Sequence, residues 1–302
     1  ESWNFAFESA GFKNAIQVKV QPDTAQWDAG DIRYNVLRWT SSPNPPFGGY
    51  GPSFVNPHTG EILGADIMLE WVYITNRIVQ GELFENAASF QENEHPMDGH
   101  YCHAGSLMQS NNLFAKTAVD AMDLSEVSKE RLIRESLKRL VLHEVGHTLG
   151  LNHNFKGSNL LTYEEIKQKE ITFEKGLCSS VMEYPSINFS LDPDNQGLYY
   201  DTVPGAYDHW AIRFAYSEVD AAGLTKILDE STYPEHAFGN DADDMRGTGK
   251  GMDPDAMIYD LTSDPVSYAI DRMKLVNTIF PELIDKYSKP GESYQELLDS
   301  YY

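Results

Sequence analysis

His143-Glu144-Val145-Gly146-His147-Thr148-Leu149-Gly150-Leu151-Asn152-His153 is the stretch that decides the fold of this 302-residue chain. It has the form H-E-x-x-H followed by x-x-G-x-x-H. Two histidines four residues apart lie on one face of a helix, about 6 Å apart at Cβ, so both imidazoles can reach one metal ion. Gly150 follows where a residue that adopts positive φ can end the helix, so that the chain turns back and His153 supplies a third ligand.

The chemistry of these residues predicts a catalytic metal site. Three imidazole nitrogens leave one position of a tetrahedral zinc ion open for water, which distinguishes a catalytic site from a structural one. Glu144 directly follows the first ligand and points to the side of the metal, where it can take a proton from the activated water. We therefore expect one Zn²⁺ ion, held by His143, His147 and His153, with Glu144 as general base. The alternative is a helix whose histidines merely pack in a core.

A second motif, Ser180-Val181-Met182-Glu183-Tyr184-Pro185, has the form S-x-M-x-Y. The two motifs in this order resemble those of the metzincin metalloproteases. The resemblance implies that Met182 is the Met-turn residue, an apolar floor beneath the zinc ligands, which suits its flexible thioether. It also implies a catalytic role for Tyr184, as an extra zinc ligand that swings away to stabilise the reacting oxyanion. A packed aromatic side chain near the cleft is the alternative for Tyr184.

Shorter phrases resemble a large group of bacterial zinc-dependent met-zincin proteins, and they lie at 6–16, 31–34, 57–63 and 205–212. This resemblance runs from residue 3 to about residue 216. It implies an α+β, metzincin-like fold with a twisted mixed β-sheet in an upper subdomain, an active-site helix and a mainly helical lower subdomain. It also implies a secreted, periplasmic or cell-surface setting. Because the first strand of the family would lie before Trp3, we expect the chain to be a piece of a longer protein.

The predicted organisation has three parts. Residues 1–153 form the upper catalytic subdomain with the zinc helix, residues 154–216 form the lower catalytic subdomain with the Met-turn, and residues 217–302 form a helical C-terminal extension. Hydrophobic periodicity further predicts a short helix at 2–10, strands at 15–20 and 32–39, and helices at 71–90, 107–122, 205–216 and 267–283. In the helix at 205–216, apolar surface is expected from Trp210, Ile212, Phe214 and Ala215.

The zinc helix itself should begin near Asp123, because Asp123 and Glu126 fit a capping box. An apolar stripe then leads to His143, and it consists of Ile133, Leu137, Leu140 and Val141. This stripe is typical of a helix that packs one face against a core.

A hairpin is predicted from strands at 51–55 and 61–68 around a turn at 56–60. In metzincins the strand that borders the cleft binds substrate as an added antiparallel strand, and Gly51-Pro52-Ser53-Phe54-Val55 occupies that place. Backbone hydrogen bonds along such an edge hold an extended peptide across the metal. The expected partner is therefore a protein or peptide substrate.

Composition excludes some other classes of partner. The formal net charge is −23, from 23 basic and 46 acidic side chains, and no run of Lys or Arg could track phosphates. Nucleic acid is therefore not an expected partner. No stretch of 18 apolar residues exists, so no membrane span is expected. The two cysteines, Cys102 and Cys178, are too few for a disulfide framework and form either one bridge or two free thiols. The sequence leaves the oligomeric state open.

Other clusters offer weaker alternatives. His95, His100, Cys102 and His103 could hold a second metal, but their spacing fits no established motif. Residues 240–244, Asn-Asp-Ala-Asp-Asp, offer oxygen ligands for Ca²⁺ or form a solvated loop. His209 is expected to be a packed histidine.

The favoured function is a zinc-dependent endopeptidase, and two alternatives remain. One is a zinc amidase or deacylase on a non-peptide substrate, and the other is a non-catalytic binding module with a relic zinc site.

Overall fold

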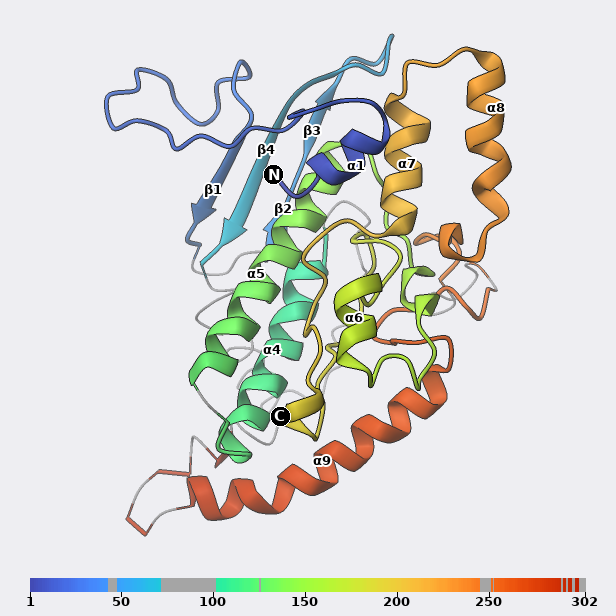
Figure 1. Cartoon of the computed structure of the whole chain (residues 1–302). Coiled ribbons are helices and arrows are strands. Elements are labelled where there is room, and N and C mark those ends of the chain that lie inside the picture. Colours follow the sequence, from blue (N-terminus) through green and yellow to red (C-terminus); the bar gives the residue numbers. More distant parts are fainter. Residues whose placement is uncertain are drawn as a thin grey trace.

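The computed structural model describes residues 1–42, 48–71, 102–124, 126–244, 251, 253–288, 290–291, 293–294 and 297–298, and the fold is of the mixed α+β class. Figure 1 shows a small sheet at one end of the molecule and the long helix α5 (Glu126–Thr148) running away from it. Helix α4 (Ala104–Ala121) lies beside α5, and α9 (Pro265–Tyr287) crosses the end far from the sheet. The expected α+β class is confirmed.

The sheet is organised around β4 (Ile62–Glu70). Strand β1 (Val36–Thr40) pairs with β4 in parallel on one side. On the other side β2 (Gly49–Tyr50) and β3 (Ser53–Val55) follow one another, both antiparallel to β4. Since Ser53 lies opposite Ala65, the predicted hairpin of residues 51–55 and 61–68 is confirmed. Among the described residues, β2 and β3 pair with no strand other than β4, so they form one edge of this sheet.

The largest core lies where α4, α5 and α9 meet. Each helix contributes one apolar face, and burying a leucine-sized side chain stabilises the fold by about 1.5–3 kcal/mol. The helix predicted at 107–122 is thus confirmed, with a start at Ala104. The residues concerned include Ala115, Ala118 and Val119 of α4, Leu132 and Leu140 of α5, and Leu275, Ile279 and Leu283 of α9.

The N-terminal segment packs beneath the zinc helix. Helix α1 (Asn4–Ser9) lies against α7 (Ala206–Tyr216), where the Phe7 and Tyr216 rings meet edge to face at 5.1 Å. The fully buried Trp3 donates a hydrogen bond from Nε1 to the carbonyl of Leu142 at 3.0 Å. The predicted short helix at 2–10 is confirmed, and it supports α5 next to the first metal-ligand position.

Two strand predictions need correction. Residues 15–20 form no strand, because the Asn4 side chain occupies both backbone groups of Ile16, at 2.8 Å each, and Val18 and Val20 are exposed. In the segment 32–39 only the part from Val36 onward is a strand. Before it, the chain turns at Asp31, whose carbonyl accepts from the amide of Tyr34 at 3.0 Å.

The zinc helix also differs from its prediction at the start. It begins at Glu126, while Asp123 has φ 52 and its carboxylate accepts from Lys286 Nζ at 2.9 Å. Because an N-cap residue has extended backbone angles, the predicted capping role of Asp123 is wrong. The buried face passes through Leu132 and not Ile133, which is 51% exposed.

The helix predicted at 205–216 is confirmed as α7, with Ile212 buried and Trp210 partly buried. Phe214 and Ala215 are exposed, so their predicted packing is wrong. The other helices among the described residues are α6 (Lys169–Lys175), α8 (Ala221–Asp229) and the 3₁₀ turns η1 (Gly157–Leu160), η2 (Pro193–Asn195), η3 (Glu230–Thr232) and η4 (Pro234–His236). In the described parts of the chain, none of the helices combines the length and apolar character that crossing a bilayer requires. The helix predicted at 71–90 lies outside the described residues, apart from Trp71.

Candidate active site

Three histidines from one helix and the turn after it face a common point. His143 and His147 lie one turn apart on α5, with ring centroids 4.8 Å apart. Gly150 then adopts φ 88, as its place in the sequence predicts, and its amide donates to the carbonyl of His147 at 3.0 Å. The chain reverses there, so His153 returns to within 4.8 Å of His147 and 5.4 Å of His143, measured between ring centroids.

Each imidazole is oriented by an acceptor at its Nδ1 atom. Nδ1 of His143 donates to the carbonyl of Val181 at 2.8 Å, and Nδ1 of His147 donates to the carbonyl of Leu151 at 3.0 Å. Nδ1 of His153 donates to Oδ2 of Asp241 at 2.8 Å. A carbonyl or carboxylate oxygen only accepts, so Nδ1 carries the proton and Nε2 presents its lone pair. All three Nε2 atoms are thus prepared as metal ligands.

The donor set fits a zinc ion. Nε2 of His143 and Nε2 of His147 are buried and have no hydrogen-bond partner among the described residues. Such orphaned nitrogens are rare in folded proteins, and a shared metal ion would satisfy both. Burial lowers the pKa of His143 well below its usual value, and burial also lowers the pKa of His147 to about 4. The neighbouring histidines add to both shifts. The rings of His143 and His147 are therefore neutral, which is the form that binds metal.

A fourth donor joins the cluster. Sγ of Cys102 and one nitrogen of each of the three histidines all lie within 4.8 Å of one another. Cys102 and Cys178 are both free thiols, so the bridge between them is not formed. The His103 amide donates to the Tyr184 hydroxyl, and His95 and His100 lie outside the described residues. The alternative of a second metal held by His95, His100, Cys102 and His103 therefore stays a prediction.

The Met-turn lies directly under the zinc helix. Met182 is fully buried, and a Cβ atom on Gly146 would lie 2.3 Å from its Sδ, so a larger residue at position 146 would force the thioether to move. Asp208 fixes the turn, because its carboxylate accepts from the Ser180 hydroxyl and the Val181 amide, both at 2.7 Å. The Val181 carbonyl held in this way is the acceptor that orients His143.

Tyr184 leaves the Met-turn toward the histidines. Its hydroxyl lies 2.8 Å from Nε2 of His153, 3.0 Å from the amide of His103 and 3.3 Å from Sγ of Cys102. The side chain is only 4% exposed. The hydroxyl, and not merely the ring, therefore faces the cluster, although the ring also contacts Phe155 with centroids 5.2 Å apart.

Glu144 lies between the cluster and the edge of the sheet. Burial raises the pKa of its carboxyl group to about 8, while the Cys102 thiol and the Gly51 amide nearby act in the opposite direction. Neither carboxylate oxygen forms a well-aligned hydrogen bond within the described part of the chain. A Cβ atom on Gly49 would lie 2.6 Å from Oε1 of Glu144. A Cβ atom on Gly51 would lie 2.4 Å from the backbone carbonyl oxygen of Glu144. The predicted substrate strand thus runs directly past the predicted base.

The family comparison agrees with this geometry. A family model described as Met-zincin matches residues 125–302, which include the zinc helix, the Met-turn and α9. The chain belongs to the Met-zincin family. No curated protein and no solved structure gave a match. The resemblance to met-zincin proteins is confirmed over residues 125–302. The matched range extends past residue 216, where the resemblance of the shorter phrases ended, and it does not include residues 3–124.

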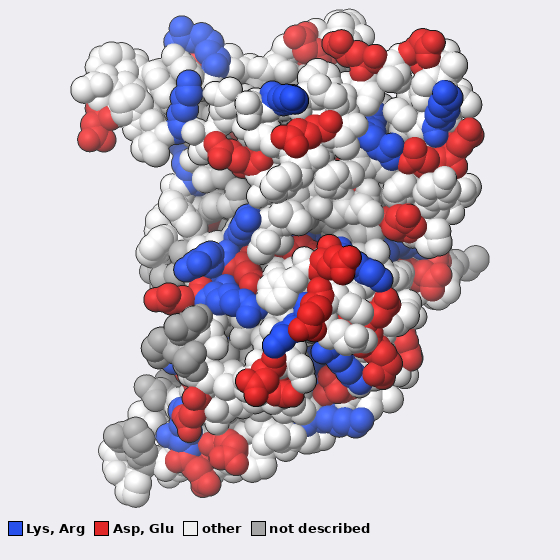
Figure 2. All heavy atoms as spheres, in the orientation of Figure 1, with Lys and Arg blue, Asp and Glu red and all other residues white. Residues whose placement is uncertain are grey.

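Membership of the Met-zincin family implies a metzincin-like fold and a zinc metallopeptidase acting on peptides. The candidate metal site of this Met-zincin consists of His143, His147, His153 and Cys102. Figure 2 shows acidic and basic side chains interspersed over one face of the molecule. On that face they form no continuous basic strip of the kind that follows a phosphate backbone.

Some residues of the Met-zincin site escaped the sequence prediction. Asp241 lies in the loop 240–244, which the sequence offered as a Ca²⁺ site, but its carboxylate accepts a hydrogen bond from His153. Asp243 in the same loop accepts a hydrogen bond from the amide of Asn240 at 3.0 Å. These contacts give the calcium alternative no support. Asp208 and the cluster position of Cys102 were also missed, because no sequence spacing links them to the histidines. His209 is partly buried on α7 and lies outside the cluster.

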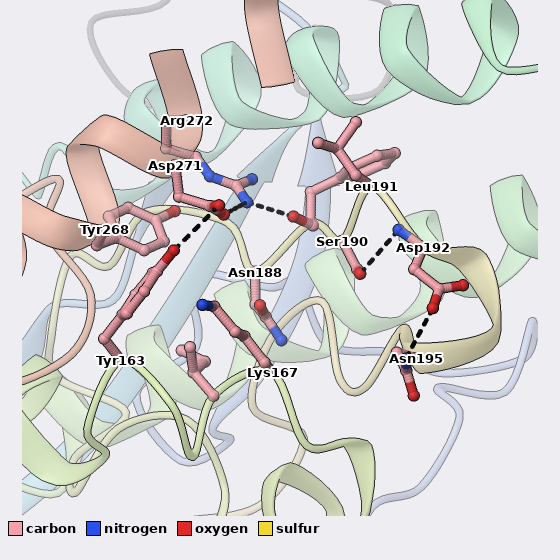
Figure 3. Close-up of a pocket in the computed structure, with 12 residues that line it drawn as sticks. Tyr163, Lys167, Asn188, Ser190, Leu191, Asp192, Asn195, Tyr268, Asp271 and Arg272 are labelled. Atoms are coloured by element: carbon pink, nitrogen blue, oxygen red, sulfur yellow. Dashed lines mark hydrogen bonds and ion pairs between the residues drawn. The ribbon is translucent and has the colours of Figure 1, made fainter. Parts of the chain in front are cut away.

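A separate cavity of about 230 Å³ lies between the segment 163–167, the segment 188–195 and α9 (Figure 3). None of the histidines of the cluster lines it. The Tyr163 hydroxyl donates to Oδ1 of Asp271 at 3.2 Å, and Arg272 donates to Oδ2 of Asp271 at 3.2 Å and to the carbonyl of Phe189. The Tyr163 contact joins α9 to the segment before the Met-turn, and the Phe189 contact joins α9 to the segment that follows it.

Proposed function

We propose that this Met-zincin is a zinc-dependent endopeptidase in which Glu144 is the general base. One observation carries the proposal. Nδ1 of each of the three histidines forms a hydrogen bond, so that the three Nε2 atoms face one buried point. Beside this point lies the Glu144 carboxyl group, whose oxygens have no well-aligned hydrogen bond among the described residues. A core of packed histidines would have no reason to leave buried nitrogen and oxygen atoms unsatisfied together. Retention of Glu144 next to the ligands also argues against a relic site.

The residues then have distinct tasks. Zinc, when bound by the three histidines, polarises the scissile carbonyl and lowers the pKa of water toward about 7. Glu144 takes the proton from the attacking water and later delivers it to the leaving amine. Tyr184 directs its hydroxyl at the developing oxyanion, where a preorganised donor is most effective. No covalent bond between chain and substrate is required.

The substrate would lie along the edge formed by β2, Gly51, Pro52 and β3. An extended peptide added antiparallel to this edge gains backbone hydrogen bonds that depend little on its side chains. Since Gly51 contacts the backbone of Glu144, such a peptide would pass beside the base. Phe54 and Val55 are 45% and 48% exposed and offer apolar contacts at the far end of the edge.

The decisive experiment combines metal analysis with digestion of a peptide library by the native chain and by Glu144→Gln. We expect one zinc per chain in both, with cleavage by the native chain and a loss of at least about 100-fold in the variant. Glu130→Gln, the same change on the exposed face of α5, is the matched control and should cleave normally.

Other outcomes would replace the proposal. Substantial turnover by Glu144→Gln would remove the assignment of the base. Zinc binding without cleavage of any peptide or denatured protein would favour a binding module. Hydrolysis of small amides without peptide cleavage would favour an amidase or deacylase.

We also propose a secreted, periplasmic or cell-surface setting, which rests on the resemblance to exported bacterial proteins. Fractionation of the native host, with detection of the chain by antibody, tests it. Recovery from the cytosol alone would contradict the proposed setting.

A further inference from the structure

Arg139 is a buried cation one helical turn before the first candidate metal ligand. It lies four residues ahead of His143 on α5, and it is only 1% exposed. Among the described residues, no other arginine and no lysine is buried. A buried charge is costly unless it is paired and hydrogen-bonded, so the contacts of this guanidinium group must offset that cost.

The guanidinium group binds the carbonyl groups on both sides of Met182. Nη1 of Arg139 donates to the carbonyl of Val181, and Nη2 donates to the carbonyl of Glu183 at 2.9 Å. Because the donors of a guanidinium group have a fixed planar geometry, this contact sets the distance between the two carbonyl groups. The Met-turn is thereby joined to α5 before and after its methionine.

Each of these carbonyl groups adjoins a functional side chain of the site. The Val181 carbonyl also accepts from Nδ1 of His143 at 2.8 Å, so it orients that imidazole. The Glu183 carbonyl belongs to the peptide bond that precedes Tyr184, whose hydroxyl lies 2.8 Å from Nε2 of His153. A rotation of this peptide bond would carry the tyrosine side chain with it. One guanidinium group therefore contacts the backbone that orients the histidine and the backbone that carries the tyrosine.

We propose that Arg139 is a positioning residue that sets the geometry of His143 and of Tyr184 together. This inference rests on the proposed zinc function. The positive charge has a separate effect. Burial raises the pKa of Asp208 to about 6 and that of Glu183 well above its usual value, and the charge of Arg139 acts against burial at both carboxyl groups. An informative variant therefore keeps the charge and changes only the arrangement of donors.

Arg139→Lys is this variant, because lysine keeps the positive charge but offers one ammonium group in place of two separated donors. Arg134→Lys makes the same change on the exposed face of α5 and is the matched control. We expect Arg139→Lys to bind one zinc per chain with an unchanged KM. Its kcat should be about 10- to 100-fold lower, since a displacement of about 1 Å can cost that much. Arg134→Lys should equal the native chain in all three quantities.

Replacement of zinc by cobalt measures the ligand geometry without turnover. The visible absorption bands of cobalt depend on the angles between its ligands, so they should shift in Arg139→Lys and stay unchanged in Arg134→Lys. Circular dichroism and urea unfolding of the metal-free chains show whether each variant folds. Arg139→Gln, whose amide can donate to one carbonyl at most, is the second variant and should give the same shift and the same fall in kcat. Failure of both variants to fold would assign Arg139 to the fold alone and overturn the proposal.

A double-mutant cycle tests the link between Arg139 and Tyr184. Tyr184→Phe should lower kcat by about 100- to 1,000-fold in the native background. In the Arg139→Lys background it should cost only about tenfold, because the hydroxyl is already displaced. Equal costs in both backgrounds, or native kcat and native cobalt bands in Arg139→Lys, would overturn the positioning role and leave the zinc peptidase intact. A chain that binds no zinc would instead overturn the proposed function, and this inference with it.

Discussion

Asp241 accepts a hydrogen bond across 2.8 Å from Nδ1 of His153, a residue 88 positions earlier in the chain. The contact sets the tautomer of His153, because a carboxylate cannot donate and Nδ1 must carry the proton. It also lies within a wider junction, where the Phe155 amide donates to the carbonyl of Gly239 at 2.7 Å. The region after α8 therefore contributes directly to the geometry of the metal cluster.

Asp241→Asn should weaken zinc binding by about 10- to 100-fold, the usual effect of losing an outer carboxylate from a metal-bound histidine. The amide keeps a possible acceptor but loses the negative charge that makes the imidazole a stronger ligand. Competition with a chromogenic chelator measures the affinity. Asp255→Asn changes an exposed acid in the same region and should have no effect. Equal affinities of native chain and Asp241→Asn would show that the contact does not tune the metal.

Tyr184→Phe should lower kcat by about 100- to 1,000-fold, the cost of removing one oxyanion donor. The hydroxyl faces His153 and not the core, so the ring of the variant should still pack against Phe155. Zinc content should stay near that of the native chain. Steady-state kinetics with metal analysis measures both quantities, and Tyr233→Phe, at a half-exposed tyrosine, is the control. An unchanged kcat would assign Tyr184 a packing role only.

The parts of the site that the sequence predicted are those set by local geometry. The helical period predicts that His143 and His147 lie on one face of the helix. The need for positive φ at the helix end predicts that the helix stops at Gly150. Both are properties of a few neighbouring residues. The hairpin around residues 56–60 was predictable for the same reason, since the turn and the alternating strands adjoin one another.

The parts of the site that the sequence did not predict depend on contacts between distant segments. Asp241 reaches His153 through the packing of a loop, and Cys102 reaches the cluster through the start of α4. Residues 15–20 have a strand-like composition, but the Asn4 side chain occupies the backbone groups of Ile16 that a neighbouring strand would use. β propensity reflects packing against neighbours, and the sequence alone does not say which neighbours are present.

Gly146→Ala should destabilise the fold by about 1–3 kcal/mol, although alanine is normally the better residue inside a helix by about 1 kcal/mol. The new methyl group would lie 2.3 Å from Sδ of Met182 and 3.1 Å from the Trp3 ring, in a fully buried place. Urea unfolding of the metal-free chain measures the change. In a Met182→Ala background the same substitution should cost less than half as much. Equal costs in both backgrounds would show that Met182 does not set the spacing.

Asp208 should make part of the stability of the fold dependent on pH. Burial raises the pKa of its carboxyl group from 3.8 to about 6, although the group accepts hydrogen bonds from Ser180, Val181 and Gly205. Between pH 3.8 and about pH 6, the folded chain binds more protons at Asp208 than the unfolded chain does. Its contribution to stability is therefore fully present below about pH 4 and is lost as the pH rises through about 6.

The Asp208→Asn variant isolates this contribution, because other buried acids such as Asp260 titrate in both proteins and cancel in the comparison. As the pH rises from 4 to 6, the free energy of unfolding of the native chain should fall more than that of the variant, by on the order of 3 kcal/mol. Urea unfolding at pH 4, 5, 6 and 7 gives both curves. The variant should also be less stable than the native chain at pH 7 by about 1–3 kcal/mol, since an amide cannot accept all three hydrogen bonds. Parallel curves would mean that the Asp208 carboxylate remains charged across this range and holds the Met-turn independently of pH.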